Sequence, residues 1–197
     1  QPDFGTSAAL IGVVLLMVFA AGLSFRYLAA VTAVLIPATA LVVRMEPYRM
    51  RRWLSFLDPS ADPAGASFQL NQSLIAVGSG GPWGRGFMDG VQKLFYIPEP
   101  HTDFIYAVIA EELGLIGATV VVVCFCVIAM RGIRASMCAP DRFGALLATG
   151  VTAMIAVQAF VNLSVVLGLL PTKGIPLPFV SNGGSSMIVS LAAMGIL

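Results

Sequence analysis

Charged side chains are scarce in this sequence, and so are the side chains that build metal centres. Only 11% of the 197 residues are charged, the net charge is +1, and there is one histidine, His101, with three cysteines. No basic run or recognition motif supports binding to nucleic acid. Cys124 and Cys126 fall inside an apolar run and Cys138 in a predicted short link, so we expect no disulfide framework.

Two kinds of catalytic centre also lack the residues they need. His101 and Asp103 could present two metal ligands, but no other Cys, His or carboxylate has a suitable spacing. The histidine lies in a Pro-flanked segment without a nucleophile-elbow pattern, which argues against a Ser-His-Asp mechanism. A short apolar core followed by a small-residue cleavage site is not visible, so no signal peptide is predicted.

Apolar residues dominate instead. They make up 58% of the chain, and the mean hydropathy is +0.91. Five windows are, wholly or in part, long and apolar enough to cross a bilayer: 6–23, 28–43, 104–130, 143–170 and 185–197. The sequence therefore predicts an all-α, polytopic helical membrane protein. Because it opens without Met and stops inside an apolar run, we expect a piece of a larger bundle.

These windows divide the chain into three predicted regions. Residues 1–45 form two transmembrane helices, 46–103 a large extracytoplasmic loop, and 104–197 three transmembrane helices, the last truncated. Within the loop, 68–77 is too short to cross and is predicted to lie at the interface as an amphipathic helix. Because successive transmembrane helices cross in alternate directions, the loop and 171–184 should lie on the same side of the membrane. The arginines of the short links favour the other side as cytoplasmic, although several cations of the long loop oppose this rule.

Asp103 is the sharpest candidate for chemistry, because it lies between the polar loop and the third apolar window. One interpretation is a helix cap whose carboxylate accepts N–H groups of the first turn. The other is a general base, because a carboxylate beside low-dielectric lipid takes up a proton more readily than one in water. One residue could serve both purposes.

Further polar residues lie deeper in the predicted helices. On an unbroken helix Glu111 would lie roughly 12 Å below Asp103 and about 80° around, while Glu112 would point to the opposite face. Such carboxylates must be protonated, paired or next to a wet cavity, so only Glu111 is expected to share a cavity with Asp103. Gln158 and Asn162, one turn apart in a neighbouring helix, are natural partners for the Glu111 carboxylate and are expected to join helices.

Lys173 is expected on the same membrane side as Asp103. It could be a snorkelling lysine that anchors a helix end. Alternatively, its charge could contact a pyrophosphate, where it would stabilise a leaving group. The following residues 181–186 begin a predicted helix, whose first N–H groups also favour anions. Alone, this pattern does not choose between the two.

Many segments, in order along the chain, are similar to those of the SEDS (shape, elongation, division and sporulation) family of bacterial cell-wall polymerases, and most like its division-type branch. The matching segments are 1–6 (QPDFGT), 46–52 (EPYRMRR), 56–59 (FLDP), 62–63 (DP), 69–70 (QL), 72–76 (QSLIA), 92–96 (QKLFY), 98–99 (PE), 101–104 (HTDF), 111–114 (EELG), 171–174 (PTKG) and 183–186 (GGSS). Asn182 departs from the pattern, because the family usually has tyrosine there, and residues 84–90 differ from the usual glycine-rich run.

The resemblance implies a bundle of about ten membrane helices, of which this chain holds roughly the second half, in the bacterial cytoplasmic membrane with an outward-facing active site. It implies polymerisation of lipid II by a glycosyltransferase, with Asp103 as the catalytic base. The residues with implied substrate-binding roles are Lys173, Arg52, Lys93, Gln72, Glu111 and Ser185. Whether a divalent cation assists is left open, and no other cofactor is expected.

The implied partners are a class B penicillin-binding protein with transpeptidase activity, other division or elongation proteins and membrane lipids. Two other functions stay open, a flippase for lipid-linked precursors and a non-catalytic division scaffold. A transporter should place its ionisable groups near the membrane midplane, whereas Asp103 is predicted at the surface. A scaffold predicts that Asp103 is dispensable.

Overall fold

The computed structural model describes residues 4–45, 50, 56, 67–86, 103–172 and 174–197. All regular structure in these ranges is helical, which confirms the predicted all-α class. The helices with defined bounds are α1 (Phe4–Ala20), α2 (Phe25–Met45), α4 (Phe68–Gly80), α6 (Ile105–Cys138), α7 (Arg142–Val166) and α8 (Gly184–Ile196). Of these, α2, α6 and α7 are long and apolar enough to cross a membrane, and α1 and α8 are shorter apolar helices.

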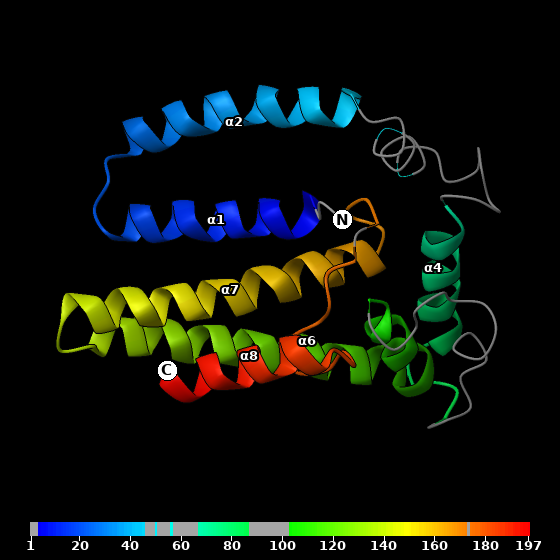
Figure 1. Cartoon of the computed structure of the whole chain (residues 1–197). Helices are drawn as coiled ribbons and strands as arrows, with labels where there is room; N and C mark the ends of the chain where they lie inside the picture. Colours follow the sequence, from blue (N-terminus) through cyan, green and yellow to red (C-terminus); the bar gives the residue numbers. More distant parts are fainter. Residues whose placement is uncertain (1–3, 46–49, 51–55, 57–66, 87–102, 173) are drawn as a thin grey trace.

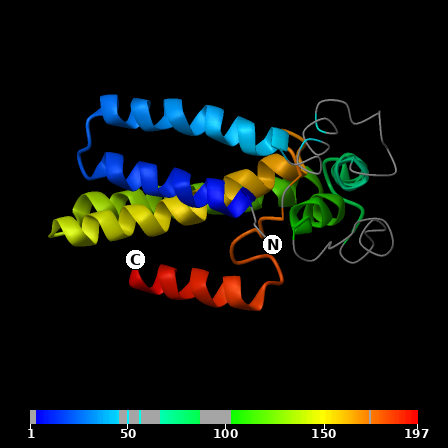
Figure 2. The ribbon, with the colours of Figure 1, turned by 45° about the horizontal axis from the view of Figure 1, so that its top comes forward.

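The long helices run alongside one another, and α4 lies across one end of them (Figures 1 and 2). In this bundle α1 packs on α7, α7 packs on α6, and α4 contacts both α6 and α7. The first turns of α1 and α8 and the last turns of α2 and α7 lie at the same end as α4 (Figure 1). All segments that were predicted to share one side of the membrane, as far as the structure describes them, therefore gather at this end.

The link between α6 and α7 is shorter than the sequence predicted. We expected a loop over 131–142, but α6 continues to Cys138, so the placement of Cys138 in a loop was wrong. Arginine does not end a helix, whereas Pro140 disfavours the helical conformation at Ala139, which is extended. Asp141 then caps α7 by accepting a hydrogen bond of 3.1 Å from the Gly144 N–H.

Small residues allow the helices to approach closely. A Cβ on Gly132 of α6 would meet the side chain of Thr152 in α7, with Cγ2 at 2.7 Å. One turn further along, the hydroxyls of Ser136 and Thr149 share a hydrogen bond of 2.7 Å. Close backbone approach and interhelical hydrogen bonds are the main forces between helices in lipid, and α6 and α7 form the most extensively packed pair among the described helices.

The α7 helix ends in a Schellman motif. Gly168 has φ +71°, its N–H donates to the Val165 carbonyl, and the Leu169 N–H donates to the Ser164 carbonyl at 2.7 Å. The chain reverses here. As a result, the segment after Leu170 is carried back over the end of α7.

The α4 helix is packed on protein. The predicted 68–77 helix extends to Gly80, with Leu70, Ser73, Ala76 and Gly80 buried. The hydroxyl of Ser73 donates to the Leu70 carbonyl within its own helix and, at 3.1 Å, to the Val166 carbonyl of α7. This second bond satisfies a carbonyl at the end of α7, where the helix itself supplies no donor. The helix predicted to lie at the interface therefore packs on α6 and α7 as well.

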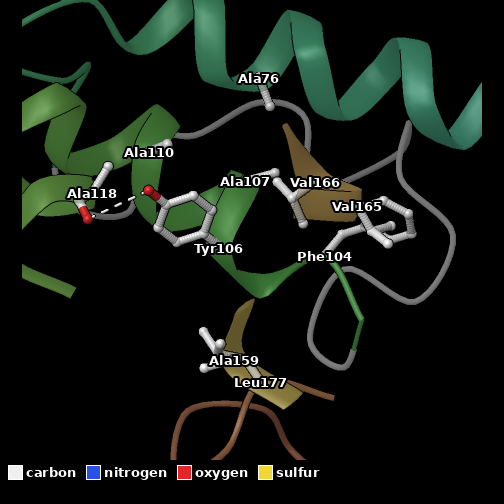
Figure 3. Packing of buried hydrophobic residues seen from close by; sticks show 10 residues of the cluster. All are labelled: Ala76, Phe104, Tyr106, Ala107, Ala110, Ala118, Ala159, Val165, Val166 and Leu177. Carbon is white, nitrogen blue, oxygen red and sulfur yellow. Dashed lines mark hydrogen bonds between the residues drawn. The ribbon is translucent and has the colours of Figure 1, made fainter. Parts of the chain in front are cut away.

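Figure 3 shows the cluster of buried apolar residues that connects α4 with α6 and α7. Its members come from α4, the first part of α6, the last part of α7 and the segment that follows α7: Ala76, Phe104, Tyr106, Ala107, Ala110, Ala118, Ala159, Val165, Val166 and Leu177. Because this cluster surrounds the start of α6, it holds the segment that carries Asp103.

Candidate functional site

The α6 helix is broken at Gly114, which has φ 65° and ψ −163°. Around the break, carbonyl and N–H groups lose their helical partners, and the loop after α4 replaces them. The N–H groups of Arg85 and Gly86 donate to the carbonyls of Glu111 and Glu112 at 3.0 and 3.1 Å. In return, the N–H of Leu115 donates to the Gly81 carbonyl at 2.9 Å. The loop and the broken helix thus satisfy each other's backbone groups.

A contact of Tyr106 shows how far the break bends the chain. Its hydroxyl donates to the Ala118 carbonyl at 3.4 Å (Figure 3). In an unbroken helix these two residues would be separated by a rise of about 18 Å, beyond the reach of a tyrosine. Residues 105–113 therefore do not continue the axis of 115–138. Asp103 and Glu111 both precede the break, so it does not affect their predicted spacing of roughly 12 Å, and the depth of Glu111 in the membrane stays a prediction.

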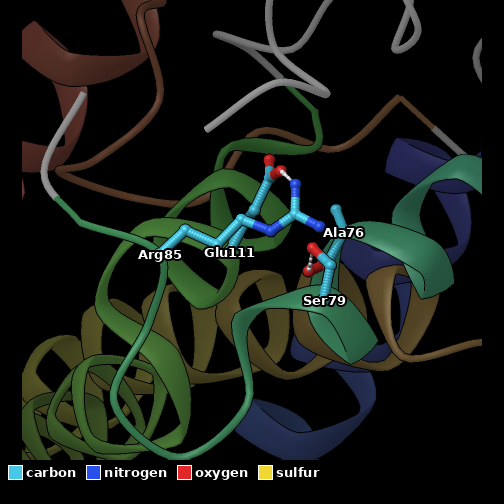
Figure 4. A network of polar contacts seen from close by, with 4 residues as sticks. All are labelled: Ala76, Ser79, Arg85 and Glu111. Carbon is cyan, nitrogen blue, oxygen red and sulfur yellow. Dashed lines mark hydrogen bonds and ion pairs between the residues drawn. The ribbon is translucent and has the colours of Figure 1, made fainter. Parts of the chain in front are cut away.

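The two glutamates before the break are both buried, Glu111 at 0% and Glu112 at 8% exposure. We predicted that Glu112 would point to the opposite face from Glu111, and both faces of this segment are thus covered by protein. Glu111 forms an ion pair with Arg85 at 3.5 Å, and the Arg85 side chain is 45% exposed (Figure 4). Arg85 was missed as a partner because it comes from a loop without helical periodicity.

This ion pair leads to a stability prediction. Arg85→Gln should lower the free energy of unfolding by about 1–3 kcal/mol, because it removes this cation from a fully buried carboxylate. The effect is limited because Arg85 is partly exposed and solvent screens its charge. Glu111→Gln in the Arg85→Gln background should restore part of the loss. Melting temperatures of the four forms test this. Strictly additive effects of the two changes would contradict the coupling.

Asp103 does not occupy the N-cap position of α6. The helix begins at Ile105, and the N-cap position is Phe104, which makes no side-chain cap bond. The Phe104 carbonyl accepts the N–H of Ala107 at 2.9 Å. The cap position is therefore one residue later than predicted, and a bond from the first turn to the Asp103 carboxylate stays a prediction.

That carboxylate lies against the segment after α7. A Cβ built on Gly174 would be 2.9 Å from Asp103 Oδ2 and 3.7 Å from its Cγ. The backbone carbonyl of Asp103 accepts a hydrogen bond of 2.8 Å from the side-chain amide of Asn162, and the same nitrogen donates to the Ile175 carbonyl at 2.7 Å. Asp103 and the segment containing Gly174 are thus adjacent, as their shared side predicted.

A tight turn follows this segment. The N–H of Leu177 donates to the Ser181 hydroxyl at 2.7 Å, and the Ser181 N–H donates to the Leu177 carbonyl at 3.0 Å. Within the turn, Phe179 has φ 65°, a conformation that residues other than glycine seldom adopt. Thr172, Ile175 and Leu177 are buried. The segment is therefore fixed on both sides of Gly174.

The remaining predicted residues lie on other elements or outside the described ranges. Gln72 is partly buried in α4, and Ser185 is exposed in the first turn of α8. Gln158 lines a cavity of about 170 Å³ between α1, α7, α8 and Ile175–Pro176, away from Glu111's ion pair. Lys173, Arg52, Lys93 and His101 lie outside the described residues.

Metal binding gains no support from the geometry. Among the residues that the structure describes, no group of three or more His, Cys, Asp or Glu side chains could hold a metal ion. The chemistry available here is that of a half-buried carboxylate, Asp103, beside backbone, with a separate ion pair that leaves an arginine partly exposed.

Comparison with known proteins gives a consistent result. The profile of the FtsW/RodA/SpoVE family, described as "Cell cycle protein", matches residues 1–197. A protein of Geobacter sp. (strain M18) named "Probable peptidoglycan glycosyltransferase FtsW" is 47% identical over the whole chain, which covers 54% of that protein. "Stage V sporulation protein E" of Bacillus subtilis (strain 168) is 45% identical, again over the whole chain and 54% of its own length.

Two solved structures are similar as well. A chain from the structure of a peptidoglycan synthase complex matches with a TM-score of 0.76 and 35% identity, over 100% of this chain and 55% of that one. A mutant of the rod shape determining protein RodA of Thermus thermophilus matches with a TM-score of 0.62 and 28% identity, over 100% of this chain and 49% of that one. The chain spans about half the length of the curated relatives it matches.

Proposed function

This chain belongs to the FtsW/RodA/SpoVE family of cell cycle proteins, and from that membership we propose that the protein is a peptidoglycan glycosyltransferase that polymerises lipid II. In the proposed reaction, a sugar hydroxyl of the acceptor attacks the anomeric carbon of the growing glycan. A new glycosidic bond forms, the bond to the carrier breaks, and undecaprenyl pyrophosphate leaves. The protein would act in the bacterial cytoplasmic membrane with its site facing outward.

The observation that carries this proposal is the placement of Asp103. Its carboxylate lies at the end of the bundle, half-buried, against the segment around Gly174. A carboxylate in such a position can accept the proton of an attacking hydroxyl while the substrate's lipid stays in the membrane. The name of one relative, "Probable peptidoglycan glycosyltransferase FtsW", supports this chemistry.

Other residues are proposed to bind the substrate. Lys173, Arg52 and Lys93 would neutralise the pyrophosphate, because ammonium and guanidinium groups suit phosphate oxygens. Glu111 is fully buried, so we propose that it acts on the substrate only by holding Arg85, whose guanidinium is partly exposed. Gln72 and Ser185 would contact the sugar or the phosphates from α4 and α8.

The proposed partner is a class B penicillin-binding protein, which would cross-link the strands that this protein makes. A similar chain occurs in a structure that describes the coordination of polymerization and crosslinking by a peptidoglycan synthase complex, and this supports the pairing. Other division or elongation proteins would join the same assembly.

The full-length protein, reconstituted in vesicles with its transpeptidase and labelled lipid II, tests the function. We expect glycan polymer on gels, which a muramidase degrades. The same vesicles are tested for movement of labelled lipid II across the bilayer. Translocation without polymer would favour a flippase, and neither activity would favour a scaffold; both results would contradict the proposal.

Gly174→Ala should damage activity more than stability. The new Cβ would be 2.9 Å from Asp103 Oδ2, so the carboxylate must move, while Gly174 itself is exposed and needs no left-handed backbone. We expect polymerisation to fall roughly 10- to 100-fold, because small displacements of a catalytic group have effects of this size. The melting temperature should change little.

Gly195→Ala is the matched control for this substitution. It lies near the end of α8, and a Cβ there would meet no atom within 4 Å. Its polymerisation rate should stay within about twofold of the unmodified protein, since nothing has to move. If Gly174→Ala behaves like Gly195→Ala, the carboxylate does not depend on this contact.

A further inference from the structure

The Asn162 amide joins two segments that meet at the proposed site. Asn162 lies in α7 and is 2% exposed. Its side-chain nitrogen donates to the Asp103 carbonyl at 2.8 Å and to the Ile175 carbonyl at 2.7 Å. One nitrogen therefore connects Asp103, two residues before α6, with Ile175, the residue after Gly174.

An amide is suited to this connection in a way that most side chains are not. It carries two N–H donors on one nitrogen, whereas a serine or threonine hydroxyl carries one and a carboxylate carries none. A glutamine has the same two donors, but its extra methylene would place them further from the α7 backbone. At position 162, asparagine is therefore the uncharged side chain with the required reach and donors.

The other end of the amide shows that packing does not explain this residue. Asn162 Oδ1 is buried and accepts no hydrogen bond in the part of the chain that the structure describes. A buried acceptor without a partner is unfavourable, and an apolar residue would avoid it. The two donated bonds must outweigh this. These two bonds hold the backbone of Asp103, whose carboxylate lies against Gly174, the residue before Ile175.

We propose that Asn162 is a positioning residue, which holds the Asp103 carboxylate at a fixed place relative to the segment after α7. This proposal rests on the proposed glycosyltransferase function. Asn162 does not touch the substrate, because its side chain is buried. It acts through Asp103, so its loss should lower the rate of the chemical step and leave substrate binding nearly intact.

Another buried polar residue of α7 offers a contrast and a control. The Thr152 hydroxyl donates to the Ala148 carbonyl of its own helix at 2.7 Å, away from the start of α6. Thr152→Val removes a buried hydrogen bond while keeping the shape of the side chain. It should leave both kcat and KM within about twofold of the unmodified protein.

The experiment uses the full-length protein with lipid II and compares Asn162→Leu, Asn162→Ser and Thr152→Val. We expect Asn162→Leu to lower kcat by roughly 10- to 100-fold, with KM for lipid II changed less than about threefold. Asn162→Ser, which keeps one donor, should fall between Asn162→Leu and the unmodified protein. Size-exclusion profiles and melting temperatures show which variants are folded.

The outcomes separate this proposal from the function on which it rests. If the unmodified protein makes no polymer, the proposed function fails. If it makes polymer and a folded Asn162→Leu keeps its full kcat, only the positioning role is overturned. A change confined to KM also overturns it, because Asn162 would then serve binding. If neither variant of Asn162 folds, Asn162 is a folding residue and the proposal is wrong.

Discussion

Asp103→Asn is expected to lower glycan polymerisation by roughly 10²- to 10⁴-fold, the range that a general base contributes. Asparagine matches the shape of aspartate and can keep the backbone hydrogen bond from Asn162, because that bond uses the Asp103 carbonyl. It cannot accept a proton at neutral pH. The substitution therefore isolates the proposed chemistry from the fold. Polymer is measured with the reconstituted protein and labelled lipid II.

Asp141→Asn provides the same chemical change at another place. Asp141 accepts the Gly144 N–H at the start of α7, on the link between α6 and α7, and asparagine caps a helix about as well. We expect its activity to stay within about twofold. Equal polymer from the Asp103→Asn protein and the unmodified protein would remove Asp103 from the mechanism, whatever the control shows.

Gly114→Ala should have the largest effect on stability. The backbone at Gly114, with φ 65° and ψ −163°, lies in a region essentially restricted to glycine. A Cβ there would meet the Gly84 nitrogen and lie 2.8 Å from the Pro82 oxygen, and these backbone atoms cannot move aside as a side chain could. Strain and overlap together should lower the free energy of unfolding by about 3 kcal/mol or more.

Gly78→Ala is the control for this change. It lies in α4, close in sequence to the same loop, and a Cβ at this position would meet no atom within 4 Å. Alanine has a higher helix propensity than glycine, so the melting temperature should stay constant or rise slightly. Melting is followed by tryptophan fluorescence of the purified protein. A Gly114→Ala protein as stable as Gly78→Ala would mean that the break is not required.

The helices were predictable because apolar length alone marks a membrane helix. The break in α6 was not. Gly114 occurs in Glu111-Glu112-Leu113-Gly114, and a single glycine inside a helical run is usually tolerated. The partners that make the break possible come from 81–86, about 30 residues earlier in the chain. Periodicity within one segment contains no information about donors from another.

Only part of the site could be predicted from the sequence. The alternating directions of the predicted helices placed Asp103 and the 171–174 segment on one side, and the structure brings Asp103 against Gly174. The sequence predicted the general role of Asn162 but not its hydrogen-bond partners. Its spacing from Gln158 indicated a residue that joins elements, but its acceptors are backbone carbonyls, one of them 59 residues away. Every residue carries such a carbonyl, so no side-chain pattern could identify the right ones.

The break at Gly114 also resolves a hydrophobic mismatch. A straight helix of 34 residues would rise about 51 Å, whereas the hydrocarbon core of a bilayer measures about 30 Å. After the break, residues 115–138 rise about 36 Å, which a slight tilt accommodates. The remaining nine residues, 105–113, take another direction, as the Tyr106–Ala118 contact shows. Their irregular junction and the two buried glutamates are surrounded by protein, which supplies the hydrogen-bond partners that lipid could not.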